Sequence, residues 1–488
     1  MELAEQFQTP IFDAVKNYVD SKVIAFHVPG HKQGKGLTEL RDYLGEAVLK
    51  IDLNGMSDLD FATQPNGVIR RSQELAASAF GARSVFFLVN GTTSGVEAMI
   101  MSICHPGDEI IIPRNAHKSA FNGLILSGAM PVYVYPESYR DCGLVTGVTV
   151  ENIESAIKSH PHAKAIFLIN PSYYGVCPDL RSIVRLAREL NMAVIVDEAH
   201  GTHFYFHEGL PLPAMKAGAD ASSISMHKTG GSLTQSAALL VGKGYITPEA
   251  AWEVLSLTFT TSASYLLLCS LDLARKQLAV KGRDLIAALM RLSNWARQEI
   301  NQIDGLRAFG RELTMLPGVY DFDELKLTVS LLGLGITGYE AERILRQKYN
   351  LQIELADLYS IVPYLGVGDT EAEIETLLAA LKELAKTNRA PRKNQCPELP
   401  LIAEAPKMVV TPREAFYCPK KVVRLENAAD EIAGEPIMAY PPGIPIVSLG
   451  ERISREMVDY IRFLKCKNCA LQGASDPEVN YLRVLGTE

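Results

Sequence analysis

Between residues 70 and 250, short runs of apolar residues alternate with stretches in which apolar positions recur every three or four residues. The short runs predict strands, and the recurring positions predict helices. Strands are expected at residues 84–89, 109–112, 132–135, 165–169, 193–196 and 222–225, and helices at residues 94–103 and 180–190. Continuous apolar strands that alternate with helices are typical of a doubly wound α/β fold with a mostly parallel sheet. Ligands of such sheets bind at the carboxyl ends of the strands, so the residues after each strand are candidates for a site.

The pattern changes beyond residue 250. The apolar spacing predicts helices over residues 266–277 and 283–302. A smaller α+β unit follows, with a strand expected at residues 326–331 and a helix at residues 371–385.

Two breaks in the pattern mark boundaries. Polar residues at 388–395 predict a linker, and the Pro-rich stretch at 440–445 predicts a turn. We therefore expect an N-terminal segment (1–60), a large domain (61–300), a small α+β domain (301–390) and a C-terminal domain (398–488).

The amino-acid composition indicates which classes of protein are compatible with the chain. The 488 residues are 47% hydrophobic and 21% charged, which is typical of a soluble globular protein. The net charge of −8 argues against nucleic-acid binding and is compatible with a cationic small molecule. The first residues hold no apolar core of the signal-peptide type, and no stretch of 18 apolar residues occurs. A cytoplasmic protein without a membrane span is expected.

The eight cysteines are scattered through the chain, which favours free thiols over a disulfide framework. Cys466 and Cys469 form one closely spaced pair. A zinc site would need a second pair of ligands, and no clear pair follows. We therefore expect no metal site and favour a structural or chance origin for this pair.

Lys228 follows the predicted strand at residues 222–225, in the run SISMHKTGGS. An amine among small, hydroxylated residues suits a Lys that condenses with an aldehyde, because small neighbours let a flat cofactor approach the backbone. A lone Lys in a Gly-rich turn is usually an ordinary surface residue. The cofactor interpretation therefore depends on the rest of the chain supplying a site.

Three other strand ends carry suitable groups. Gly91, Thr92 and Thr93 open a helix directly after a strand, where N–H groups and hydroxyls can bind phosphate. Asp197 ends an apolar strand, where its carboxylate needs a cationic partner such as a protonated pyridine nitrogen. His117 follows the strand at residues 109–112 and could lie flat on a cofactor ring or transfer a proton. Each motif alone is weak, but their order and spacing together predict a pyridoxal phosphate (PLP) site.

The chain resembles the Orn/Lys/Arg decarboxylase family of PLP enzymes, which have the aspartate-aminotransferase (type I) fold. The strongest match surrounds Lys228 and extends to the Gln after the glycines. The resemblance runs nearly end to end and fits the shorter bacterial form, which lacks an N-terminal wing domain. The segments that carry it are residues 29–34, 114–119, 197–201, 223–236, 334–340 and 440–445.

The resemblance implies a role for each matching residue. Lys228 would bind the cofactor covalently, Asp197 would hold the pyridine nitrogen, His117 would stack on the ring and His200 would lie near its phenolic oxygen. The phosphate would be surrounded by Gly91, Thr92, Thr93, Ser225 and His227. The implied catalytic residues are Lys228, His117, Asp197 and His227.

A further segment implies a shared site. Residues 261–265 resemble a segment whose hydroxyls reach the phosphate of the neighbouring subunit, so Ser262 and Ser264 would serve a partner in a homodimer or higher homo-oligomer. This chain has Ala263 where the family pattern has Pro, which weakens the expected loop shape.

The implied reaction is decarboxylation of a basic amino acid, and the implied process is polyamine biosynthesis. Arginine, which would give agmatine and carbon dioxide, is the first choice, ahead of lysine (cadaverine) and ornithine (putrescine). An aminotransferase on the same fold and a catalytically silent homologue are the alternatives. Intact Lys228 and Asp197 disfavour the silent homologue. Glu354 and Asp357 are candidates for the basic tail of the substrate, although a structural role is equally expected for them.

Overall fold

The computed structural model describes residues 3–139, 143–388, 406–439 and 444–486. The chain divides into two compact units, Met1–Ser102 with Ala193–Ala287 and Ile103–Met192 with Ala288–Glu488. The predicted linker at residues 388–395 lies outside the described residues except for Asn388, and so does most of the predicted turn at residues 440–445.

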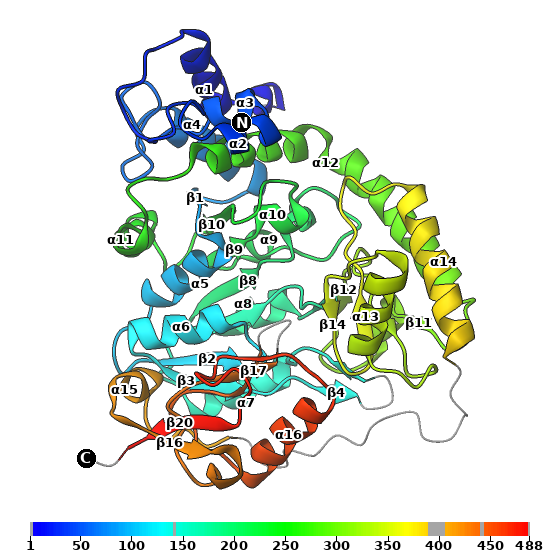
Figure 1. Ribbon diagram of the computed structural model, residues 1–488. Coiled ribbons are helices and arrows are strands. Elements are labelled where there is room, and N and C mark those ends of the chain that lie inside the picture. The colour runs from blue at the N-terminus through cyan, green and yellow to red at the C-terminus, as the bar shows by residue number, and fades with distance from the viewer. Residues whose placement is uncertain (1–2, 140–142, 389–405, 440–443, 487–488) are drawn as a thin grey trace. The chain divides into compact units, whose positions relative to one another are not determined.

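The first unit holds four neighbouring strands in the order β1-β10-β9-β8 (Figure 1). Strands β8 and β9 are parallel, whereas β10 is antiparallel to both of its neighbours. Helix α5 packs against β9 and β10. The strands are β1 (Ser84–Leu88), β8 (Ala193–Glu198), β9 (Ala221–Ile224) and β10 (Ala237–Val241). The helices are α1 (Pro10–Asp20), α2 (Thr38–Leu44), α3 (Glu46–Lys50), α4 (Val68–Phe80), α5 (Gly91–Met101), α9 (Ala214–Ala217), α10 (Met226–Thr229) and α11 (Pro248–Thr258), and α12 (Tyr265–Ile300) begins in this unit.

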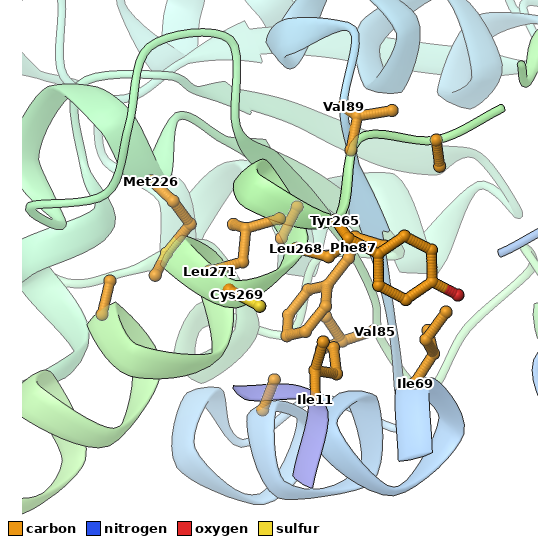
Figure 2. Close-up of a cluster of buried hydrophobic side chains, with 14 of the residues drawn as sticks. Ile11, Ile69, Val85, Phe87, Val89, Met226, Tyr265, Leu268, Cys269 and Leu271 are labelled. Atoms are coloured by element: carbon orange, nitrogen blue, oxygen red, sulfur yellow. The ribbon is translucent and has the colours of Figure 1, made fainter. Parts of the chain in front are cut away.

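The core of this unit gathers side chains that are far apart in sequence (Figure 2). Ile11 of α1, Val85 and Phe87 of β1, and Tyr265 and Leu271 of α12 are all buried together. The Tyr265 hydroxyl donates to the carbonyl oxygens of residues 59 and 60, so this buried polar group is satisfied. The start of α12 is thereby fixed beside β1.

The second unit contains three parallel strands in the order β6-β2-β3 and a four-stranded antiparallel sheet in the order β11-β13-β15-β14. The parallel group consists of β2 (Glu109–Pro113), β3 (Met130–Val134) and β6 (Ala165–Ile169), with α6 (Lys118–Ser127), α7 (Val150–Ser159) and α8 (Leu180–Glu189). The antiparallel sheet consists of β11 (Arg307–Ala308), β13 (Val329–Ser330), β14 (Leu355–Ala356) and β15 (Ser360–Val362), with α13 (Gly338–Tyr349) and α14 (Glu371–Thr387).

The described residues after 405 form small sheets, two α-helices and a short 3₁₀ helix. Strand β16 pairs with β20, and β17 lies between β18 and β19. Their core includes Leu425, Val447, Ile461 and Val484. The elements are α15 (Pro412–Tyr417), β16 (Lys420–Arg424), β17 (Ile437–Ala439), β18 (Ile444–Val447), α16 (Arg455–Cys466), β19 (Leu471–Gln472) and β20 (Tyr481–Leu485). The remaining strands are β4 (Ser138–Tyr139), β5 (Leu144–Val145), β7 (Val176–Cys177) and β12 (Asp321–Phe322).

The predicted α/β class is confirmed, with parallel pairings predominating around antiparallel β10. Two helices predicted at residues 266–277 and 283–302 are one continuous helix, α12. A Cβ at Gly282 would lie 3.0 Å from the Cβ of Phe206, so this glycine serves close packing and does not end the helix. The four-domain division stays a prediction.

Candidate active site

The predicted phosphate cradle lies at the start of α5, where the chain leaves β1. Gly91 has φ +69°, a left-handed conformation that favours glycine, and its N–H donates to the carbonyl oxygen of Gln235. A Cβ at Gly91 would meet no atom within 4 Å, so the backbone here is open to a ligand. Thr92 Oγ1 lies 2.5 Å from Ser225 Oγ, and Thr93 is half-buried beside it. The first N–H groups of α5 and these hydroxyls form a set of donors suited to an anion.

Asp197 lies at the end of β8 and is 6% exposed. Its Oδ1 accepts a hydrogen bond from the Ala199 N–H at 3.0 Å. Burial raises the pKa of Asp197, whereas the Ala199 N–H and the charge of Lys228 lower it. A buried carboxylate whose pKa is raised gains stability from a nearby cation, so Asp197 suits a protonated ring nitrogen.

Lys228 lies on the short helix α10, directly after β9. Its Nζ is 3.0 Å from Nε2 of His200, which is buried. Strands β8 and β9 are parallel neighbours with Asp197 opposite Ser223, so Asp197 and the Lys228 segment leave the same edge of the sheet. The structure therefore brings together an amine, an imidazole and a carboxylate that the sequence separates by up to 31 positions.

Other predicted cofactor residues of this unit lie on neighbouring segments. Nδ1 of half-buried His227 is 2.8 Å from the carbonyl oxygen of Ser236, which fixes the imidazole against the backbone. Ser262 is exposed and Ser264 is half-buried, in the loop before α12. Their roles stay predictions.

His117 belongs to the second unit, where it is the N-cap residue of α6. Its Nδ1 accepts from the Ser119 N–H at 3.2 Å and lies 2.9 Å from Ser119 Oγ. A ring nitrogen that accepts a backbone N–H carries no proton, so neutral His117 holds its proton on Nε2. The hydrogen bonds fix the ring orientation that a stacking role needs.

The two candidate substrate acids differ in their surroundings. Oδ1 of Asp357 accepts from the N–H groups of Tyr359 and Ser360, and Oδ2 accepts from the Tyr174 hydroxyl, all at 2.7 Å. Burial raises the pKa of Asp357, and these hydrogen bonds lower it. Glu354 is exposed and precedes β14. Asp357 thus has structural partners in place, whereas the Glu354 side chain faces solvent.

Two contacts at the site could not be expected from the sequence. Thr202 Oγ1 donates to the Ser225 carbonyl oxygen at 3.0 Å and fixes the turn after β9. The contact between Gly91 and Gln235 ties the phosphate cradle to the segment after Lys228. The position of Thr202, two residues after His200, is the only sequence signal for its role.

The residues present fit the parts of PLP. The Thr92–Ser225 cradle suits the phosphate, Asp197 suits the ring nitrogen, and Lys228 suits the aldehyde. Within the described parts of the chain, no group of three or more His, Cys, Asp or Glu side chains is placed to hold a metal ion. No described helix combines the length and apolarity needed to cross a membrane.

Known proteins resemble this chain in sequence and in fold. Residues 9–373 match the Orn/Lys/Arg decarboxylase major domain, and residues 399–476 match the C-terminal domain of the same family. The chain is 44% identical to the arginine decarboxylase of Halalkalibacterium halodurans over 484 residues, which is 99% of each chain. It is 42% identical to the arginine decarboxylase of Bacillus subtilis over 481 residues, 98% of each chain. The lysine decarboxylase LdcF of Francisella novicida shares the fold, with a TM-score of 0.85, 20% identity, and coverage of 99% of this chain and 82% of that one.

Proposed function

The chain belongs to the Orn/Lys/Arg decarboxylase family and is a decarboxylase, and we propose that it converts arginine to agmatine and carbon dioxide with PLP as its cofactor. The observation that carries the choice of arginine is the identity of 42–44% to arginine decarboxylases over nearly the whole chain. The cofactor proposal is supported by the arrangement of Lys228, His200 and Asp197.

When bound, PLP supplies a protonated ring that takes up the electron pair left on Cα by the departing carboxylate. Asp197 would keep the proton on the ring nitrogen, because its buried carboxylate is stabilised by a cation there. Gly91, Thr92 and Ser225 would bind the phosphate and fix the position of the ring.

Lys228 and the neighbouring His200 would transfer protons at the site. The Lys228 amine must lose a proton before it can attack an aldehyde, and His200 Nε2 is at hydrogen-bond distance to take it. The reverse transfer would return a proton to Lys228, which with His227 is a proposed acid for Cα. His117 would cover the ring through an imidazole whose orientation Ser119 fixes.

A substrate with a guanidinium group needs an acidic side chain that binds this group. Glu354 keeps its carboxylate toward solvent, which favours it over Asp357 for direct contact with a charged tail. A guanidinium prefers a carboxylate that accepts two parallel hydrogen bonds, whereas an ammonium needs only one oxygen. We propose that Glu354 contacts the tail and that Asp357 positions the turn beside it.

We further propose that the enzyme is a cytoplasmic homo-oligomer built on a homodimer. The first unit exposes large apolar side chains, with Ile24 80%, Phe26 94% and Tyr43 88% exposed. Such a concentration is typical of a surface that a partner covers. Phe26→Asp should halve the mass measured by light scattering, whereas Tyr320→Asp, at an exposed position of the second unit, should leave it unchanged.

The reaction is tested with arginine labelled in its carboxyl group. The expected result is one labelled carbon dioxide for each agmatine, without a keto acid. A keto acid that requires an acceptor would support an aminotransferase instead. If lysine or ornithine releases carbon dioxide and arginine does not, the substrate proposal is wrong while the reaction class stands.

A further inference from the structure

We propose that a cavity between α6 and the segment after residue 405 binds a small organic anion with an apolar or aromatic body. The cavity has a volume of about 480 Å³, within the range of small-molecule sites. It lies within the second unit, and none of its lining residues is proposed above to hold PLP or substrate. The lining residues that carry the argument are Lys118, Phe121, Ile125, Phe416, Lys420 and Arg483.

The charges around the cavity favour an anion. Among the described residues that line it, Lys118, Lys420 and Arg483 are cationic and Glu435 is the one carboxylate. Glu435 already accepts from two backbone N–H groups, those of Ser475 and Arg483, both at 2.9 Å. Among the residues that the structure describes, the Lys118 and Arg483 side chains form no ion pair. The lining therefore offers cations that a ligand anion can pair with.

The remaining wall is apolar and aromatic. Phe121 and Ile125 lie one turn apart on the face of α6 that begins with Lys118. Phe416 of α15 faces the same cavity and is 49% exposed. The Lys420 Nζ lies over the Phe416 ring, 5.7 Å from its centre, and donates to the carbonyl oxygens of Phe416 and Cys418, so the ammonium is held against this aromatic ring. A ligand with an anionic head and an aromatic body would use both.

The helix that lines the cavity is held at both ends. His117 caps its first turn through the Ser119 N–H. The Arg413 guanidinium donates to the carbonyl oxygens of Ile125 and Leu126 at the other end. The site is therefore preformed, which lowers the entropy lost when a ligand binds.

Phenyl phosphate is a suitable probe, because it joins an anionic group to an aromatic ring. Phenol carries only the aromatic ring, and inorganic phosphate carries only the anionic group. The three compounds are titrated by calorimetry into protein loaded with PLP and then freed of unbound PLP by gel filtration, so that the proposed cofactor site is filled and no free PLP competes for the cavity. We expect phenyl phosphate to bind about tenfold or more tightly than either half. Arg483→Gln should weaken it about tenfold, whereas the matched change Arg424→Gln on β16, outside the cavity lining, should have no effect.

Phe416→Ala provides a second variant and should reduce the affinity for phenyl phosphate toward that for inorganic phosphate. Equal melting temperatures of the variants and the wild type would show that folding is intact. The proposal is overturned if phenyl phosphate does not bind, if phenol binds equally well, or if the folded Arg483→Gln and Phe416→Ala variants keep the wild-type affinity. These outcomes do not depend on decarboxylase activity, so they are distinguishable from a failure of the proposed reaction.

Discussion

Asp197→Asn removes a charge from the buried end of β8 while almost preserving the side-chain volume. Burial raises the folded pKa of Asp197 above its unfolded value. The Asp197 carboxyl therefore loses its proton at a lower pH in the unfolded chain than in the folded protein. Without PLP, the free energy of unfolding consequently falls as the pH rises from the unfolded pKa through the folded pKa. The amide of the variant has no proton to lose. We therefore expect the variant without PLP to be at least as stable as the wild type at neutral pH.

The same substitution is expected to lower kcat/KM. If PLP binds as proposed, the amide leaves a buried pyridinium nitrogen without its carboxylate partner. Removing one partner of a buried charge pair costs about 3–5 kcal/mol. Since 1.36 kcal/mol corresponds to a factor of ten in rate, kcat/KM should fall by about 10²–10⁴-fold.

Carbon dioxide release from arginine and thermal unfolding with and without PLP measure both effects. Glu198→Gln is the matched control, because buried Glu198 accepts from Tyr205 Oη, Ser222 Oγ and the Ala214 N–H, and the amide cannot accept from all of them. This control should lose about 1–3 kcal/mol of stability and keep most of the kcat/KM of its folded fraction. An Asp197→Asn variant that is less stable without PLP and retains wild-type kcat/KM would refute the reasoning.

Three further predictions follow from single contacts. Lys228→Ala should abolish carbon dioxide release and the visible absorption of the covalently bound cofactor, both read by spectrophotometry; retained absorption would place the covalent link elsewhere. His200→Asn should keep that absorption and lower kcat by about 10²-fold with an altered pH profile, since the amine loses its proton acceptor; an unchanged profile would exclude this role. Glu451→Gln should lower the free energy of unfolding in chemical denaturation by about 3–5 kcal/mol, because it removes the charge that pairs with buried Arg114 at 2.9 Å. Glu431→Gln, at a partly exposed pair with Lys421, should lower it by about 0–1 kcal/mol, and equal losses would contradict the argument.

The strands of four or more residues between positions 84 and 225 could be predicted from local pattern, whereas most of the shorter strands and those after residue 225 could not. The expected strand at residues 165–169 coincides with β6, and the expected strand at residues 84–89 ends one residue after β1. Strand β10 was not predicted, because its run Ala237–Val241 is Ala-rich at its start and follows a Gly- and Ser-rich turn. The continuity of α12 through Gly282 depends on packing against Phe206, which the local sequence does not show.

The strand ends that carry the candidate site could be predicted from the sequence. The contacts between their side chains could not. Asp197 and Lys228 could be selected because Asp197 lies at the end of one strand and Lys228 comes shortly after another. The contact between Lys228 and His200 could not, since it depends on β8 and β9 being parallel neighbours. The hydrogen bonds that surround Asp357 join Tyr174 to a residue 183 positions away and are likewise set by the tertiary fold.

The central claim is that arginine is the substrate of this decarboxylase. The most direct measurement is a competition in one vessel, with equal concentrations of arginine, lysine and ornithine and with the three amine products quantified together. The ratio of initial product rates gives the ratio of kcat/KM values, independent of protein concentration and cofactor loading. The account predicts agmatine in at least tenfold excess over cadaverine and putrescine. Cadaverine or putrescine as the main product, or no amine from any of the three, would contradict it.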